Sequence, residues 1–146
     1  MTFMIGLAAL SLLTGQAENP TGDFRVVARQ ADGVMNIDAA SWSRAGDVAR
    51  ARGAVYLQVS AEHRVVGLGE IQVNCADSTI RAARGAFYET DMTFIMPREP
   101  ETQWYPINTA GDRKIVDFMC GSDEGRRASI RERYSDVRAG FAVLDQ

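Results

Sequence analysis

Apolar and polar side chains alternate along most of the chain between Phe24 and Ile107, which is the pattern of strands with one buried face. The two longest segments of this kind are "DVARARGAVYLQVS" and "VVGLGEIQVNC". Each places small or apolar residues on one face and mainly Arg, Glu, Gln or Asn on the other. Shorter segments are "FRVVARQ", "GVMNID", "STIRAARGAFY" and "MTFIM", and Gly85 is the expected position of a β-bulge. We therefore predict an antiparallel sheet of about six strands, connected as a meander.

The hydrophobic period changes after this region. The stretch "GDRKIVDFMCG" predicts a short helix that ends at Cys120, with Asp112 as its N-terminal cap and Gly121 in a left-handed C-terminal position. Val116 and Cys120 are four residues apart, so they share the side of the helix that we expect to lie on the sheet. The predicted fold class is therefore α+β.

A second, amphipathic helix is predicted from Ser122 to the end of the chain, because apolar residues recur there at spacings of four and three. These residues are Ile130, Tyr134, Val137, Phe141 and Leu144. The simplest interpretation is a helix that packs on its own domain. A helix that binds a partner or a second copy, and a helix on a membrane surface, are the alternatives.

The first residues have the features of an export signal. An apolar run of about 11 residues, from Phe3 to Leu13, is shorter than the roughly 20 that span a bilayer. Gly15 and Ala17 follow with the spacing of a signal-peptidase site. We predict a signal peptide over residues 1–17 and a mature, soluble chain that begins at Glu18, in the periplasm or secreted. The alternative is a short buried helix or strand.

Two cysteines, Cys75 and Cys120, are the only ones in the chain. In an oxidising compartment they are most simply a disulfide, and closing a loop of this length stabilises a fold by about 4 kcal/mol in the chain-entropy model. A structural zinc site needs four ligands, whereas the chain offers two Cys and one His, and it has no C-x-x-C motif. Since Cys75 falls on the apolar side of its strand, the bond would attach the helix to the sheet.

Three short motifs carry a resemblance to a known family. They are an Asp-x-x-Ser turn at Asp38 and Ser41, a Cys after a long strand at Cys75 with Arg81 following, and Trp104 and Pro106 before a helix that ends in Cys120. In this order they resemble the bacterial surface-adhesin protein E family, over roughly residues 24–120. The resemblance implies an antiparallel sheet with a helix tied to it by the disulfide, and a place in the cell envelope. The family's namesake is a surface lipoprotein that binds host matrix proteins. We therefore divide the chain into a signal peptide (1–17), a protein E-like domain (18–121) and a helical extension (122–146).

Residues that could carry catalysis are few. His63 is the only histidine and falls in a predicted turn, without the pattern of a nucleophile near it. Asp77, Glu89 and Asp91 flank strand ends, and a pair of them is the basis for the alternative of a small cell-wall or polysaccharide hydrolase. We predict a protein that is not an enzyme, with no catalytic residue, metal or cofactor.

The polar face of the predicted sheet is the candidate binding surface. Its residues are Arg25, Arg29, Arg50, Arg52 and Tyr56, with Glu70 and Gln72 beside them. The simplest interpretation is a solvated face with cross-strand ion pairs, and the functional one is a recognition surface for an acidic or polar partner. The net charge of −3 argues against general nucleic-acid binding. We expect a protein or another envelope component as partner, with pairing of strand edges into a homodimer as a further option.

Overall fold

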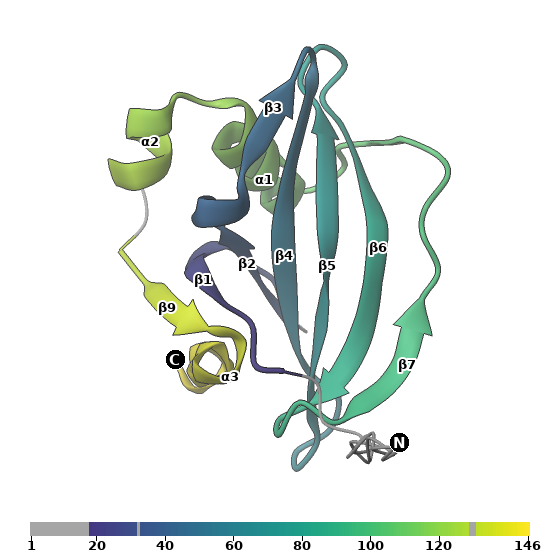
Figure 1. Ribbon diagram of the computed structural model, residues 1–146, viewed down its shortest axis with the longest axis vertical. Helices are drawn as coiled ribbons and strands as arrows, with labels where there is room; N and C mark the ends of the chain where they lie inside the picture. The colour runs from purple at the N-terminus through teal and green to yellow at the C-terminus, as the bar shows by residue number, and fades with distance from the viewer. Residues whose placement is uncertain (1–17, 32, 129–130) are drawn as a thin grey trace, which may run out of the picture.

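The computed structural model describes residues 18–31, 33–128 and 131–146. The predicted signal peptide and Ile130 of the predicted C-terminal helix lie outside these residues. Within them the chain forms one antiparallel sheet with short helices packed against both faces (Figure 1).

The described part of the sheet has nine strands. They are β1 (Thr21–Arg29), β2 (Gly33–Asp38), β3 (Ser43–Ala45), β4 (Val48–Gln58), β5 (Arg64–Asn74), β6 (Thr79–Glu89), β7 (Phe94–Arg98), β8 (Tyr105–Pro106) and β9 (Arg133–Asp136). The order across the sheet is β7-β6-β5-β4-β2-β1-β9, with β3 on β4 and β8 on β6. The predicted antiparallel sheet is confirmed, but it is a meander only in part, because the last described strand, β9, pairs with the first strand, β1. The prediction of about six strands is too low because the short strands β3, β8 and β9 have no clear alternation of their own.

Two bulges decide which side chains share a face. Glu70 pairs with Arg84 while Ile71 pairs with Ala82, so the extra residue in β6 is Ala83 and not Gly85, as the sequence had suggested. Gly69 is required beside this bulge, because a Cβ there would lie 1.9 Å from the carbonyl oxygen of Arg84. A second bulge, at Val27 in β1, has a similar effect on the arginines of that strand.

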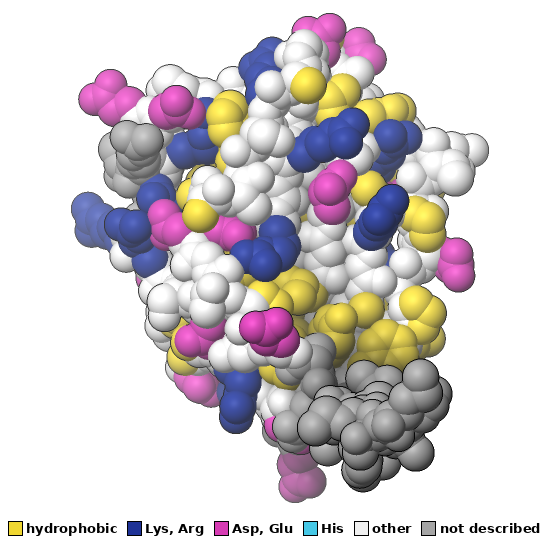
Figure 2. Space-filling model, viewed as in Figure 1, with side chains coloured by type: hydrophobic (Ala, Val, Ile, Leu, Met, Phe, Trp, Pro, Cys, Tyr) yellow, Lys and Arg dark blue, Asp and Glu magenta, His cyan; other side chains and the backbone are white. Residues whose placement is uncertain are grey.

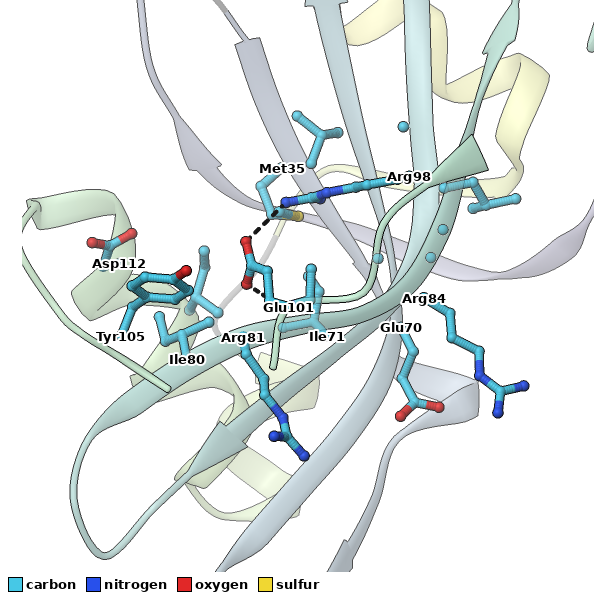
Figure 3. A pocket seen from close by; sticks show the side chains of 18 of the residues that line it. Met35, Glu70, Ile71, Ile80, Arg81, Arg84, Arg98, Glu101, Tyr105 and Asp112 are labelled. Carbon is cyan, nitrogen blue, oxygen red and sulfur yellow. Dashed lines mark hydrogen bonds and ion pairs between the residues drawn. The ribbon is translucent and has the colours of Figure 1, made fainter. Parts of the chain in front are cut away.

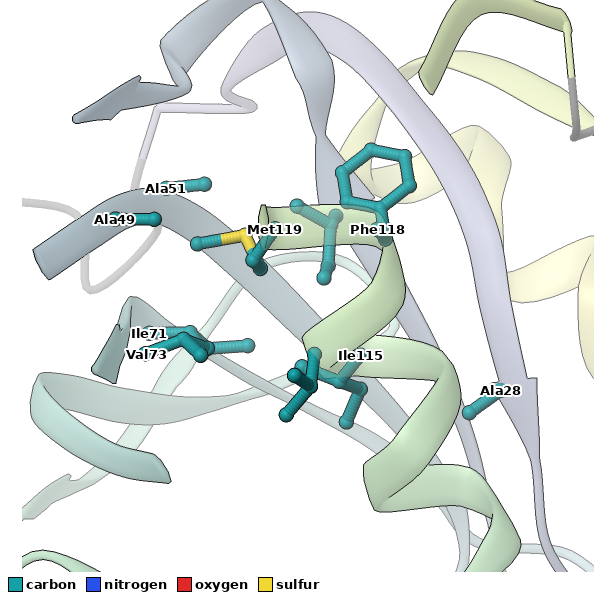
Figure 4. Close-up of a cluster of buried hydrophobic side chains, with 10 residues drawn as sticks. Ala28, Ala49, Ala51, Ile71, Val73, Ile115, Phe118 and Met119 are labelled. Carbon is teal, nitrogen blue, oxygen red and sulfur yellow. The ribbon is translucent and has the colours of Figure 1, made fainter. Parts of the chain in front are cut away.

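Helix α1 (Ala110–Cys120) covers one face of the sheet. It buries Ile115, Val116, Phe118 and Met119 in a cluster with side chains from β1, β2, β4 and β5 (Figure 4). The cluster's sheet residues are Ala28, Ile37, Ala49, Ala51, Ile71 and Val73. Cys120 forms the predicted disulfide with Cys75, at a Cα–Cα distance of 5.7 Å. The antiparallel sheet and the disulfide that joins its helix to it are thus confirmed.

The ends of α1 differ from the prediction. Thr109 is the N-terminal cap, and its hydroxyl accepts a hydrogen bond from the backbone N–H of Asp112. Asp112 lies three residues further on and completes the capping box, because its carboxylate accepts from the N–H of Thr109. Gly121 is not left-handed, since its φ is −74°. A Cβ there would instead lie 2.6 Å from the carbonyl oxygen of Asp117.

The C-terminal segment covers part of the opposite face. The prediction of one amphipathic helix here is wrong, because α2 (Asp123–Ala128) is followed by strand β9, which pairs with β1, and only then by α3 (Val137–Gly140) and a 3-10 turn, η2 (Phe141–Asp145). Asp136, in an extended conformation, accepts from the N–H of Ala139 and so begins α3 after the strand. The apolar spacing still marks burial: Val137 and Phe141 lie in a second core cluster.

This second cluster lies between the C-terminal segment and the face opposite α1. Its buried members are Phe24, Val34, Ala54, Tyr56, Val66, Met92, Val137, Phe141 and Val143. Tyr56 is at the centre: its hydroxyl donates to the carbonyl oxygen of Val137 at 2.7 Å, and its ring meets that of Phe141 edge-on. Each face of the sheet is therefore partly covered, and the uncovered parts are where ligands can reach it.

Candidate recognition surface

The five residues predicted to share a polar face do not form one open surface. Tyr56 is fully buried beneath the C-terminal segment, and Arg25 is only 3% exposed. The bulge at Val27 turns Arg25 onto the α1 face, whereas Arg29 stays on the other. Arg29 lies at the edge of that face, where it forms an ion pair with Glu132 at 2.8 Å. Only Arg50 and Arg52 lie on the uncovered part of the predicted face.

The contacts of Arg25 give it a structural role. Its guanidinium forms an ion pair with Asp23 at 2.7 Å and donates to the backbone carbonyl of Arg126. Arg133 of β9 contacts the same carboxylate at 3.0 Å. The hydrogen bond from Arg25, with a smaller effect from Arg133, holds the pKa of Asp23 below its usual value although burial opposes this. These contacts tie β1 to β9 and α2.

Arg50 and Arg52 belong to a larger group that crosses three strands, which we call the arginine ladder. It consists of Arg50 and Arg52 of β4, Gln72 and Glu70 of β5, and Arg81 and Arg84 of β6. The strand registers place them in two rows, Arg50–Gln72–Arg81 and Arg52–Glu70–Arg84. The ladder thus contains four guanidinium groups and one carboxylate, that of Glu70, and Asp38 supplies a second carboxylate beside Arg52. Figure 2 shows basic side chains gathered with acidic ones among them on this side of the molecule.

The centre of the ladder is fixed by hydrogen bonds. The amide of Gln72 donates to Glu70 at 2.7 Å, and Nε of Arg81 donates to the amide oxygen of Gln72 at 2.8 Å. The guanidinium of Arg81 also lies over the ring of Trp104, 4.3 Å from its centroid. These contacts orient the side chains of Glu70, Gln72 and Arg81 before any partner binds.

Arg52 is held on the other side by the turn at Asp38. Its guanidinium forms an ion pair with the buried Asp38 carboxylate at 2.7 Å, and its backbone N–H donates to the hydroxyl of Ser41. Asp38 also accepts from the N–H of Ala40, and the Ser41 hydroxyl donates to the Asp38 carbonyl, in the turn η1 (Ala39–Ser41). Both side chains thus bond the backbone of their own turn.

Arg50 and Arg84 differ from the other two arginines. Both are exposed, and neither side chain forms a hydrogen bond or ion pair with any residue that the structure describes. A shallow groove of about 440 Å³ runs beside Arg50, between Ser41 and Ser43 on one side and Glu70 on the other. The alternating pattern did not place Arg81 and Arg84 together, because residues three apart lie on opposite faces of a regular strand, and only the extra residue Ala83 brings both onto this face.

A second hollow lies on the α1 face, beside the N-terminal part of the helix. It has a volume of about 280 Å³ and is lined by apolar side chains and several glycines. Arg98, Glu101 and Tyr105 stand at its rim, while Glu70, Arg81 and Arg84 project from the opposite face of the sheet (Figure 3). The two features therefore present different chemistry on opposite sides of the same strands.

Asp77 is not brought together with Glu89 and Asp91, the other two carboxylates considered for hydrolysis. Asp77 lies in the turn before β6, whereas Glu89 and Asp91 lie at its other end. An 11-residue strand separates them by roughly 33 Å. Glu89 forms an ion pair at 2.9 Å with His63, which is exposed in its turn as predicted.

The structure adds two further observations. In the described part of the chain, no group of three or more His, Cys, Asp and Glu side chains is arranged to hold a metal ion. Among the same residues, none of the helices has the length and apolar character needed to cross a bilayer.

Comparisons of this chain with protein-family models, with curated proteins and with solved structures find no match.

Proposed function

We propose that this protein is an exported, non-catalytic binding domain of the bacterial cell envelope, and that its arginine ladder binds an acidic segment of a partner protein. The observation that carries the proposal is the pair of exposed guanidinium groups, Arg50 and Arg84, which flank the fixed centre of the ladder without a bonding partner among the described residues.

The chemistry of the ladder favours carboxylates. A guanidinium group presents a planar set of donors that matches a carboxylate in a bidentate pair, and such charge-assisted bonds are stronger than neutral ones. The arginines project from adjacent strands of a sheet, so the backbone sets their spacing, and the conformational freedom lost on binding is confined to side chains such as those of Arg50 and Arg84. Because the chain as a whole is acidic, a local basic surface would also orient an acidic partner as it approaches.

Two observations support an envelope location. The disulfide Cys75–Cys120 is typical of an oxidising compartment, and the apolar run before Ala17 has the length of a signal peptide. Intact mass of protein purified from the native envelope fraction tests this. We expect a mass that begins at Glu18 and thiols that alkylate only after reduction. Retention of residues 1–17 together with freely alkylated thiols would contradict export.

The binding proposal is tested with a labelled oligoglutamate peptide and the double variant R50Q/R84Q. We expect the peptide to bind the unchanged protein and the variant to bind it at least about tenfold more weakly, since two charge-assisted contacts are lost. Binding to the unchanged protein should weaken as salt is added. Arg52 is left in place because its removal would leave the buried Asp38 carboxylate without its cation.

The matched control is R113Q/K114Q, which removes the same charge from exposed positions of α1 on the opposite face. We expect this control to bind the peptide nearly as well as the unchanged protein. Equal weakening in both variants would mean that only net charge matters, and would contradict a site at the ladder. The absence of any binding to the unchanged protein would contradict it as well.

A further inference from the structure

The hollow on the α1 face has a floor of unusual composition. Gly53, Gly69 and Gly85 are paired in register across β4, β5 and β6, so no side chain rises from the sheet along this row. The side chain of Ile71 covers Gly53. A Cβ added to this glycine would lie 2.3 Å from Cδ1 of Ile71. Further apolar side chains line the hollow: Met35, Val55, Ile80 and Ile115. The interior is therefore a small apolar slot.

The outer wall of the slot is built by residues 94–106, which follow the free edge of β6. Strand β7 pairs with Gly85–Tyr88 and β8 with Thr79–Ile80. Between them Glu101 forms two bonds with Ala82: its N–H donates to the Ala82 carbonyl at 2.8 Å, and its carboxylate accepts from the Ala82 N–H at 2.7 Å. The loop between the two short strands is thereby fixed against the sheet, and it holds the slot open beside α1.

Donors without a partner gather at the rim. Arg98 makes one contact among the described residues, at 3.3 Å to Glu101, so most of its N–H groups are available. The half-exposed Tyr105 hydroxyl has no hydrogen bond to a described residue. The acceptors are largely used: Glu101 is bonded to Ala82 and Arg98, and one oxygen of Asp112 accepts from the N–H groups of Asn108 and Thr109. The free donors of the rim are thus on Arg98 and Tyr105, while the second carboxylate oxygen of Asp112 is an acceptor without a bond to a described residue.

We propose that this slot binds a small monocarboxylate with an apolar body, its carboxylate on Arg98 and Tyr105 and its body over the glycine floor. A volume of about 280 Å³ lies just below the range of pockets that hold drug-sized molecules, which suits a ligand of this kind. The site is separate from the arginine ladder and does not depend on the function proposed for it.

Three compounds with one body and different head groups test the proposal: 3-phenylpropanoate, 3-phenylpropan-1-ol and 3-phenylpropan-1-amine, titrated into the purified, disulfide-bonded protein by calorimetry. We expect the carboxylate to bind at least about tenfold more tightly than the alcohol, because it alone accepts charge-assisted bonds from Arg98. The amine should bind most weakly. Equal binding of the acid and the alcohol, tightest binding of the amine, or no binding of any compound would overturn the proposal.

Two variants locate the site. R98Q should reduce binding of the carboxylate to the level of the alcohol while leaving the alcohol unchanged, whereas R113Q, the same change outside the slot, should alter neither. V55F should fill the slot and weaken all three compounds, and an unchanged thermal midpoint would show that it folds. Carboxylate binding that survives both R98Q and V55F would place the ligand elsewhere. R50Q, at a ladder residue that does not line the slot, should leave this binding intact, which separates the outcome from that of the ladder.

Discussion

The two covered faces of the sheet are fastened in different ways. On one face α1 is attached covalently, through Cys75–Cys120, to the end of β5. On the other face the C-terminal segment is attached by β9, which extends the sheet from β1, and by the hydrogen bond and ring contact of Tyr56. Both buried clusters are apolar and of similar size. The comparison indicates that both segments bury apolar side chains against the sheet. They differ in what must break before each one can leave the sheet: a covalent bond for α1, and hydrogen bonds and packing contacts for the C-terminal segment.

The covalent attachment does not act alone. The indole of Trp42 donates to the Met119 carbonyl at 2.9 Å, and the buried Arg126 donates to the carbonyls of Phe118, Met119 and Gly121. The guanidinium of Arg126 also lies over the Trp42 ring, 3.5 Å from its centroid. These bonds satisfy carbonyls that the end of a helix leaves without partners. The C-terminal end of α1 is thus held by the disulfide and by four hydrogen bonds from side chains, whereas the N-terminal end of the helix has a capping box.

Of the changes that test this comparison, removal of the disulfide should have the largest effect on the free energy of unfolding. We expect C75S/C120S to lower the free energy of unfolding by about 2–5 kcal/mol, since the bond closes a long loop of the unfolded chain. Urea unfolding followed by tryptophan fluorescence measures this, because Trp42 reports on the end of α1. A loss below about 1 kcal/mol would mean that Arg126 and Trp42 fasten the helix without covalent help.

Replacing Arg126 should have the next largest effect. R126M keeps much of the apolar stem but removes the donors to three helix-end carbonyls, and we expect a loss of about 2–3 kcal/mol in the disulfide-bonded protein. The matched control is R113M on the exposed side of α1, which should change the free energy of unfolding by less than about 0.5 kcal/mol. Equal losses in the two variants would contradict a role of Arg126 at the helix end.

On the other face, Tyr56→Phe should cost about 1–2 kcal/mol, because the Val137 carbonyl loses its buried donor. Burial, followed by the charge of Asp136, raises the pKa of Tyr56 well above that of a free tyrosine. A folded-state pKa above the unfolded one gives stability that is present below about pH 10 and is lost as the pH rises beyond it. Unfolding measured from pH 8 to 11 should therefore show a smaller alkaline loss in Y56F. The exposed Tyr105→Phe should leave the alkaline loss unchanged.

The smallest effect is expected at Asp23, where β1 meets β9. Arg25 lowers the pKa of Asp23 in the folded protein. The contribution of Asp23 to the free energy of unfolding is therefore present above about pH 4, the pKa of an unfolded aspartate, and is lost as the pH falls below that value. D23N should make the free energy of unfolding, measured by urea unfolding at several pH values, fall less steeply as the pH is lowered below about 4. D77N, an exposed turn residue, is the control and should keep the slope of the unchanged protein. A slope retained in D23N would assign the acid sensitivity to other carboxylates.

The order of the long strands, the helix on the sheet and the disulfide could be predicted because each depends on local period or on the count of cysteines. The composition of the candidate surface could not. A single extra residue at Val27 separates Arg25 from Arg29, and another at Ala83 brings Arg81 and Arg84 beside Arg50. Neither extra residue is itself a glycine. The C-terminal strand was missed for another reason. Spacings of four and three fit both a helix and a buried strand followed by a turn, and the free edge of β1 decides between them.

The bond between Cys75 and Cys120 also closes residues 75–120 into a covalent ring that contains β6, β7, β8 and α1. The exposed loop between Arg98 and Tyr105 is part of this ring. A protease that cleaves one peptide bond in the loop therefore cannot release a fragment, because the two new ends stay joined through the sulfur atoms. Such a nicked molecule would migrate as one species on a non-reducing gel and as two after reduction. In a compartment rich in proteases, the ring would keep the two parts of the protein joined after a single cleavage in this loop.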